Sequence, residues 1–458
     1  MKNFKFISFM AVVLAIGIAL SACGTGADVE GNNTAADSSS SLAPDVTGTK
    51  AEPVELVVWV GGTLLGDDDI AKTKSEDIIG TAATTVQIKE AFQNKYPNVT
   101  LKFEYHGWAE ELTANLMRAV MGGVGPDVVQ GESQVYELAK IGGFKELNIE
   151  DIRDEIVPGT LEVAIYNDKV YGVPFRTGVF GLIYNKDVLQ KSGYDPEKDI
   201  PTTWDQLLEM SQDITAKGKG EYYGFMIDAV PGAGSMFRLL PWILQAGGSV
   251  GTLDGDVTFN NPANVKALEF ARELAKTAPK GAAAITDEWD ALKVVQEGLA
   301  AFQVNGPWEI DWQKTMKSNC GYARLPVPEE GQTGNAIVSN IVHSVLKNSK
   351  HPAEAEAFVK FCASKEGQKI IMSNESIIPV NKTMLDEVPD YLTRNPDLKP
   401  FIDELNEAKV LAPLPSYKKN SSQVMDQWTE LKNVIFDPSK DLQAGIEKAQ
   451  QEAENAMK

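Results

Sequence analysis

Apolar and polar positions divide the chain into three regions. An apolar run from Ile7 to Leu20 follows two lysines, a stretch of small polar residues follows that run, and periodic apolar patterns fill the remainder. No other apolar run approaches the length that a membrane-spanning helix needs. The pattern predicts a secretory signal at 1–22, a flexible tether at 23–50 and a folded body beyond it.

The first part of the body alternates between strand and helix patterns. Val54–Val60 reads as a buried strand, and a polar loop with three consecutive aspartates at 67–69 follows it. A helix pattern then runs to about Tyr96, and Val99–Tyr105 alternates as a second strand. Repeated strand–helix alternation predicts an α/β layered fold.

Helix starts farther along the chain carry capping signals. Thr203 with Gln206 forms a capping box, Asn261 precedes a first-turn proline, and Pro352 opens another apolar helix pattern. The chain has 458 residues, more than one hydrophobic core usually organises, so we expect two lobes.

Charge and cysteine content narrow the possible partners. The chain has 64 acidic and 43 basic residues, a net charge of −21, which argues against nucleic acid and anionic lipid as partners. Cys320 and Cys362 are expected to be buried thiols rather than a disulfide. The segment Leu20-Ser21-Ala22-Cys23 resembles the lipobox of bacterial lipoproteins. This resemblance implies removal of the signal and attachment of acyl chains, such as palmitate, to Cys23.

Catalytic patterns are scarce. The chain has three histidines and lacks the GxGxxG, GxxxxGK, HExxH and CxxC patterns, so we expect neither a cofactor nor a metal. Ser249 fits GxSxG, but a helix pattern precedes it and a turn follows it, the reverse of a nucleophile elbow. Acidic pairs such as Glu110-Glu111 fit first turns of helices better than a glycosidase pair. A binding protein is therefore favoured over an enzyme.

Aromatic residues indicate the kind of ligand. Sugar sites combine aromatic rings, which stack on the C–H face of a pyranose, with polar side chains that bind its hydroxyls. Trp308 follows an Asn-Gly-Pro turn at the end of the apolar strand 299–304, where ligands bind in α/β proteins. Trp59 and Trp204 fit packing roles. Trp308 is the predicted ligand platform, ahead of Trp108, Trp242 and Trp428.

Several motifs resemble the bacterial extracellular solute-binding proteins of family 1, the carbohydrate-binding proteins of ABC importers, and in particular the maltose/maltodextrin-binding type. The similar islands keep the order of that family: Gly125–Val128, Tyr171–Pro174, Leu182–Asp187, Pro201–Trp204, Gly298–Phe302 with Asn305–Trp308, and Asn348–Lys350 to Ile378–Val380. The resemblance implies a two-lobe fold of the periplasmic-binding-protein kind, with a hinge and a ligand cleft between the lobes.

The lobe boundaries follow from the same resemblance. One lobe would comprise 52–176 plus 338–384, and the other 181–335 plus 388–458. The chain would cross between the lobes near 176–181, Ser339 and Leu385.

The residue-level match is partial. Trp308 matches the stacking tryptophan of the family, and Phe237 falls where an aromatic partner is expected. Departures include Gly62-Thr63-Leu64 after the first strand, Gln130–Gln134 after the third, and Gly178 in place of a glutamate near the crossing. The ligand set predicted from the resemblance is Trp308, Phe237, Thr63, Glu132, Arg176, Trp242, Trp108, Met425 and Trp428.

The expected function is that of a lipid-anchored substrate-binding protein of an ABC sugar importer. A monomer on the extracytoplasmic face of the cell membrane would catch an oligosaccharide and hand it to the transmembrane subunits of a permease. Two alternatives stay open. One is a secreted glycoside hydrolase that uses carboxylates such as Glu132 or Asp228, and the other is a sugar-sensing or adhesion lipoprotein.

Overall fold

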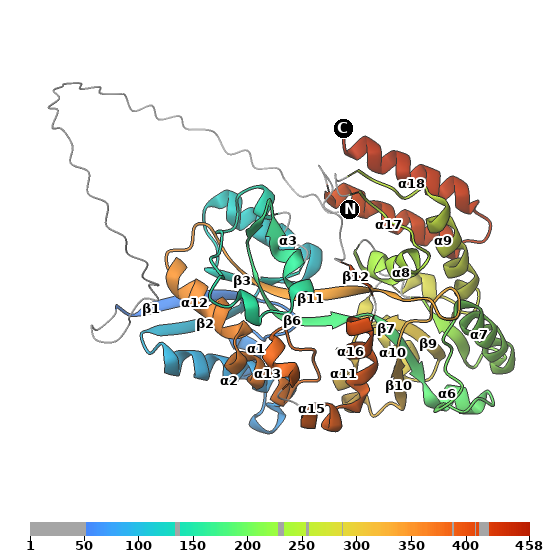
Figure 1. The fold of residues 1–458 in the computed structure, drawn as a ribbon, viewed down its shortest axis with the longest axis horizontal. Helices are drawn as coiled ribbons and strands as arrows, with labels where there is room; N and C mark the ends of the chain where they lie inside the picture. Colours follow the sequence, from blue (N-terminus) through green and yellow to red (C-terminus); the bar gives the residue numbers. More distant parts are fainter. Residues whose placement is uncertain are drawn as a thin grey trace, which may run out of the picture. The chain divides into compact units, whose positions relative to one another are not determined.

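The computed structural model describes residues 52–132, 138–227, 233–252, 256–285, 287–386, 389–407, 409–411 and 421–458 (Figure 1). The predicted signal, the tether with Cys23, and Asp228 lie outside this part. Residues Glu52–Lys458 form one compact unit. Within the described residues no helix is long and apolar enough to cross a membrane.

A six-stranded sheet organises the first lobe, and its edge strand at 409–411 comes from the segment predicted for the second lobe. Its strands are β1 (Val54–Val60), β2 (Val99–Tyr105), β3 (Val128–Gly131), β6 (Val173–Val179), β11 (Asn335–Val345) and β12 (Lys409–Leu411). β1 pairs in parallel with β2 and β3, whereas β11 runs antiparallel to both β3 and β6. The two strands predicted at 54–60 and 99–105 are confirmed. Their alternating burial follows from the opposite directions of successive side chains in a strand.

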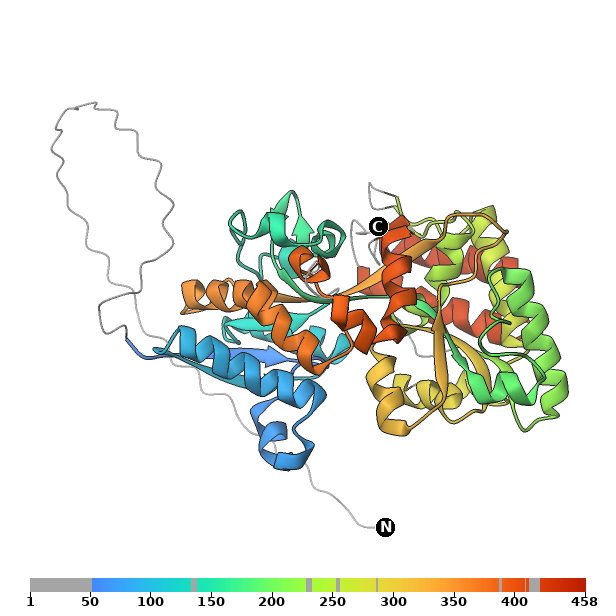
Figure 2. The same ribbon diagram turned by 60° about the horizontal axis from the view of Figure 1, so that its bottom comes forward.

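Helices cover both faces of this sheet. α2, α12 and α13 lie side by side on one face, where Phe92 meets Phe358 edge to face at 5.2 Å (Figures 1 and 2). α3 packs its Leu112 and Leu116 against Val129 of β3. Among the described residues, the α-helices of this lobe are α1 (Asp67–Lys72), α2 (Gly80–Lys95), α3 (Ala109–Gly122), α5 (Pro158–Leu161), α12 (Pro352–Ala363), α13 (Lys365–Asn374) and α14 (Lys382–Asp386). A small hairpin consists of β4 (Ile165–Tyr166) and β5 (Lys169–Val170).

A four-stranded sheet organises the second lobe. Its order is β10 (Cys320–Ala323), β7 (Gly181–Asn185), β9 (Ala300–Asn305), β8 (Tyr223–Met226). Its helices are α6 (Lys186–Lys191), α7 (Trp204–Gly218), α8 (Ala233–Gln245), α9 (Pro262–Ala275), α10 (Glu288–Gln296), α11 (Glu309–Met316), α15 (Pro389–Arg394), α16 (Lys399–Glu407), α17 (Ser421–Phe436) and α18 (Leu442–Ala456). β6 continues almost directly into β7, so the two sheets are joined by one extended segment near Phe180.

The structure confirms two predicted helix caps and contradicts one predicted loop. The side chain of Thr203 accepts a hydrogen bond from the backbone N–H of Gln206, and Asn261 caps α9 in the same way. Both satisfy first-turn N–H groups that lack a partner inside the helix. The loop predicted at 67–69 is wrong, because these residues begin α1. Asp67 binds Lys89 at 2.5 Å, and a carboxylate in the first turn favours the helix dipole.

Two of the predicted ligand residues, Trp242 and Trp428, instead lie in the core of the second lobe. Trp242 is 1% exposed and meets Trp204 and Phe270 edge to face, and Trp428 is fully buried against Phe259. Rings enclosed in this way pack the core and leave no face for a sugar. Helical spacing alone gives core and site tryptophans the same signal. The predicted buried free thiols at 320 and 362 are confirmed.

Candidate functional site

The candidate site begins at the carboxyl ends of the parallel strands in the first lobe. After β1 the chain turns at Gly61 and Gly62, where Thr63 N–H donates to the Gly61 carbonyl at 2.8 Å. Gly62 has a φ of +70°, a conformation that favours glycine. The Thr63 hydroxyl is buried and has no hydrogen-bond partner among the described residues. This turn therefore places a polar group at the edge of the sheet.

Trp108 stands beside the same turn. Its indole lies so close to Gly61 that a Cβ on that glycine would be 2.6 Å from Cε3 of the ring. The residue is the N-cap of α3 and is half-buried. A side chain larger than hydrogen at position 61 would therefore displace this ring.

Buried hydrogen bonds through Gln130 and His343 hold the turn at Gly61 in place. Gln130 of β3 accepts from Gly61 N–H at 3.3 Å, and its amide nitrogen lies 3.0 Å from Nε2 of His343. Burial lowers the pKa of His343 to about 3, so the imidazole is neutral at physiological pH. The neutral ring can accept the Gln130 N–H, which fixes the orientation of that amide and thereby its contact with Gly61.

A carboxylate lies where the first lobe meets the crossing strand. Glu132 directly follows β3, and Ser339 of β11 donates a hydrogen bond from its hydroxyl to it. Ser339 pairs in register with Gly178 of β6. The β11 strand therefore connects the carboxylate to the segment that leads into the second lobe.

Trp308 approaches this point from the second lobe. Its indole packs on two glycines: a Cβ on Gly178 would lie 2.9 Å from Cζ3, and one on Gly306 would lie 2.1 Å from the same atom. The residue is half-buried and forms the N-cap of α11, directly after the turn that ends β9. Gly178 has no side chain, and the ring uses the space that one would fill.

Aromatic rings extend from Trp308 into the second lobe. Phe180 meets Trp308 edge to face at 5.4 Å, and Phe237 stacks on Phe180 at 5.5 Å with an interplanar angle of 19°. The Arg238 guanidinium carbon lies 5.5 Å from the Phe180 ring centre. These contacts hold the ring system in a defined geometry that aromatic pairs favour.

This cluster combines features that suit a neutral polyhydroxyl ligand. Trp308 and Trp108 are half-buried and offer apolar faces, whereas Phe180 and Phe237 are buried and support the Trp308 ring. A carboxylate and hydroxyls lie at strand ends nearby. Within the described ranges, no group of His, Cys, Asp and Glu is arranged to hold a metal ion. The arrangement is one for binding by stacking and hydrogen bonding.

The structure brings together part of the predicted ligand set. Trp308, Phe237 and Glu132 belong to one connected cluster, and Thr63 and Trp108 lie at the same sheet edge as Glu132. Arg176 instead forms an ion pair with Glu375 at 2.7 Å. Its guanidinium therefore neutralises a buried carboxylate. The side chain of Met425 lies outside the described part of the chain.

Sequence reasoning missed Phe180 and Ser339 as members of the cluster. Phe180 reads as one more apolar residue of a crossing strand, and a lone serine has no local pattern. Gly178, where the resemblance implies a glutamate, was the one available signal, because a glycine leaves space beside the crossing strand.

Comparison with known proteins places this chain in a family. Residues 76–369, more than half of the chain, match the family described as bacterial extracellular solute-binding protein. The GacH receptor of Streptomyces glaucescens GLA.O, solved unliganded and with acarbose, superposes with a TM-score of 0.72 at 22% identity, covering 89% of this chain and 99% of its own. This likeness establishes the two-lobe α/β fold.

Two sequence relatives are named for the oligosaccharides that they bind. The galactooligosaccharide-binding protein of Bacillus subtilis (strain 168) is 24% identical over 94% of this chain and 97% of its own length. A maltooligosaccharide ABC transporter solute-binding lipoprotein of Streptococcus pneumoniae (strain ATCC BAA-255 / R6) is 25% identical over 68% of this chain and 71% of its own.

Proposed function

Because this chain belongs to the bacterial extracellular solute-binding protein family, we propose that it binds an oligosaccharide between its lobes and delivers it to an ABC permease. The observation that carries this proposal is the position of Trp308. Its half-buried ring lies over Gly178, whose strand partner Ser339 binds the Glu132 carboxylate. An aromatic face beside a carboxylate provides both interactions that a pyranose needs.

The names of the relatives support an oligosaccharide rather than one particular sugar. One relative is named for galactooligosaccharides, another for maltooligosaccharides, and the superposed receptor was solved with acarbose. Two of these names refer to oligosaccharides, and the third names acarbose as a bound ligand. The net charge of −21 also disfavours an acidic sugar, because like charges repel.

Binding would be coupled to hinge closure. We place the lobes at 52–176 plus 338–384 and at 181–335 plus 388–458, so that the ligand selects a closed arrangement by its higher affinity for it. Small-angle scattering should give a smaller radius of gyration with a saturating sugar. An unchanged radius at saturation would contradict closure.

A lipid anchor at Cys23 would hold the protein at the extracytoplasmic face of the membrane. The Leu-Ser-Ala-Cys sequence supports it, and the pneumococcal relative is named a lipoprotein. A Cys23→Ala protein should leave the membrane fraction, since stable anchoring needs about two acyl chains. Retention of this variant through a salt wash would show that the anchor is elsewhere.

The decisive experiment combines a sugar panel with a platform variant. Thermal-shift screening with maltose, maltotriose, maltotetraose and galactobiose identifies the ligand, and calorimetry then compares Trp308→Ala with Trp204→Ala. A stacked indole buries ~100 Å² of ligand surface, about 2–3 kcal/mol, so Trp308→Ala should weaken binding roughly 30-fold. Trp204 is buried in the core against Phe270, so Trp204→Ala is the packing control. This variant should lower the melting temperature and leave the affinity for the sugar unchanged.

A hydrolase remains the alternative that product analysis can test. Glycoside hydrolysis needs two carboxylates about 5–9.5 Å apart on either side of the scissile bond. Of the cluster residues that the structure describes, Glu132 contributes a carboxylate, which accepts a hydrogen bond from Ser339. Incubation with the panel sugars should leave them intact, and shorter products from purified protein would overturn the binding proposal.

A further inference from the structure

The helix that carries Trp308 is fixed at its first turn by a buried carboxylate. Glu309 is 0% exposed, and it accepts hydrogen bonds from Gln303 at 2.9 Å and from Gln296 at 3.1 Å. Gln303 belongs to β9 and Gln296 ends α10, so this contact joins α11 to its own lobe. A buried carboxylate needs such donors, because an unpaired buried charge costs several kcal/mol.

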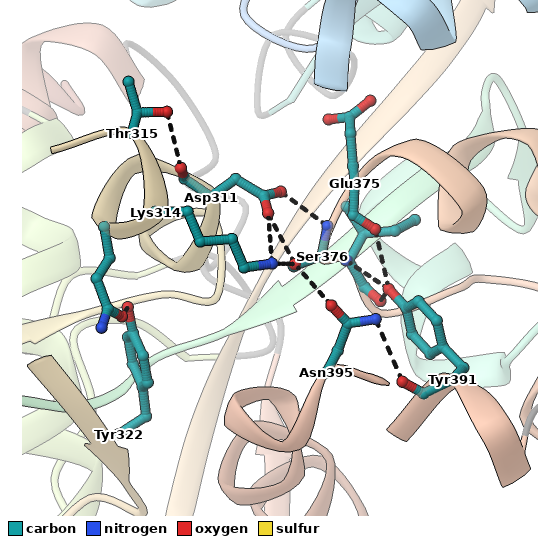
Figure 3. A network of polar contacts seen from close by, with 10 residues as sticks. Asp311, Lys314, Thr315, Tyr322, Glu375, Ser376, Tyr391 and Asn395 are labelled. Atoms are coloured by element: carbon teal, nitrogen blue, oxygen red, sulfur yellow. Dashed lines mark hydrogen bonds and ion pairs between the residues drawn. The ribbon is translucent and has the colours of Figure 1, made fainter. Parts of the chain in front are cut away.

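A second carboxylate joins the same turn to the first lobe. Asp311 accepts hydrogen bonds from both the backbone N–H and the hydroxyl of Ser376, each at 2.7 Å (Figure 3). Lys314 reaches the same serine hydroxyl at 2.9 Å, and Asn395 lies 3.2 Å from it. Ser376 is therefore enclosed by polar groups of α11 and of the segment after α15.

The residue before Ser376 is held by the first lobe. Glu375, at the end of α13, forms the ion pair with Arg176 of β6 and accepts from the Thr81 hydroxyl of α2 at 3.2 Å. On the other side, Tyr391 of α15 accepts from Ile377 N–H at 2.8 Å. Burial raises the pKa of the Tyr391 phenol, so the hydroxyl stays protonated and can also donate to the backbone carbonyls it touches. The segment Glu375–Ile377 thus connects the two lobes beside the crossing strand.

We propose that Asp311 is a positioning residue for the Trp308 ring. Asp311 lies three residues after Trp308, about one helical turn, so its two bonds to Ser376 fix the helix end on which the ring stands. The ring of one lobe is thereby set by a residue of the other lobe. The relevance of Asp311 to sugar binding rests on the proposed function. The effect of Asp311 on the position of the ring does not depend on that function.

The ion pair of Asp311 does not explain its arrangement. The Asp311–Lys314 pair is 3.2 Å long and exposed, with side chains 37% and 56% accessible. Exposed pairs three residues apart contribute little to stability. The hydrogen bonds to Ser376 are shorter and include a backbone N–H, so they are the contacts by which Asp311 acts.

The test observes the ring directly and needs no ligand. The eight tryptophans are labelled with 5-fluorotryptophan, and the ¹⁹F resonance of Trp308 is assigned by its loss in Trp308→Phe. In Asp311→Ala this resonance should move by more than its linewidth or broaden. The resonances of tryptophans outside Trp308 and the adjacent Trp312 should stay in place. Asp311→Asn, which keeps one acceptor oxygen, should restore most of the native position.

A matched control separates this contact from loss of a surface charge. Asp290→Ala removes the 2.7 Å, three-residue-spaced pair with Lys293 on α10 and should leave the Trp308 resonance unchanged. If Asp311→Ala does not fold, Ser376→Ala removes one of the two bonds and should shift the resonance in the same direction by a smaller amount. A native Trp308 resonance in folded Asp311→Ala or Ser376→Ala overturns the proposal. Loss of sugar binding in Trp308→Ala is a separate result, so the two proposals fail independently.

Discussion

Replacement of Gly178 by alanine tests the contact on which the candidate site depends. A Cβ at this position would lie 2.9 Å from Cζ3 and 3.2 Å from Cε3 of Trp308, and 3.4 Å from Cδ of Pro307. Ordinary carbon contacts begin near 3.5 Å, so the indole would have to retreat by about half an ångström. The ring also lies against Gly306 and Phe180, which restricts its movement.

The sign of the stability change is the informative quantity. Gly178 lies inside β6 and pairs with Ser339, and a glycine in a strand interior is destabilising by roughly 0.5–1 kcal/mol relative to alanine. Without a steric conflict, Gly178→Ala should therefore stabilise the protein. Overpacking costs about 1–3 kcal/mol, so we expect a net loss of about 1–2 kcal/mol in the free energy of unfolding.

Urea unfolding of four proteins decides the matter. Wild type, Gly178→Ala, Trp308→Ala and the double variant form a cycle, and Gly178→Ala should become neutral or stabilising once the indole is gone. Gly122→Ala at the end of α3 is the matched control, because its Cβ would meet Val124 at an ordinary 3.6 Å. A Gly178→Ala protein that is as stable as wild type, or equally destabilised without the indole, would refute the proposed contact.

Three further predictions concern buried groups. The pKa of His343 falls from 6.5 to about 3 on folding, so the unfolded state takes up a proton first; stability is full above about pH 6.5 and decreases as the pH falls toward 3. Urea unfolding of wild type should therefore lose about 2 kcal/mol more than His343→Gln between pH 7 and pH 5. Arg176→Ala leaves the Glu375 carboxylate buried without its cation and should cost about 3–5 kcal/mol by urea unfolding, with partial recovery in Arg176→Ala/Glu375→Gln. Trp242→Ala should cost about 3–5 kcal/mol in the same assay, and calorimetry with a sugar that binds wild type should give native affinity if the fold is retained; weakened affinity would return this residue to the site.

Much of the fold follows from local patterns in the sequence. An apolar run predicts the strand at Val54–Val60, and period-two alternation predicts the strand at Val99–Tyr105. Gln206 three residues on predicts the cap at Thr203, and the following proline predicts the cap at Asn261. These signals need no knowledge of the rest of the chain, because they arise from backbone geometry and hydrogen bonds within one turn. The aspartates at 67–69 show the limit, since a polar run is compatible with both a loop and a first helical turn.

The sequence by itself determined the kind of protein: an acidic, two-lobe α/β chain that resembles solute-binding proteins, with an aromatic residue after the β9 strand. Only the tertiary structure separated Trp308, which stands on two glycines, from Trp242, which is enclosed in the core. It also joined Glu132 to Ser339, 207 residues later. The physical reason is that such contacts depend on which strands lie next to each other. β11 returns between β3 and β6 after both lobes have begun, and no periodicity in the sequence encodes that neighbourhood.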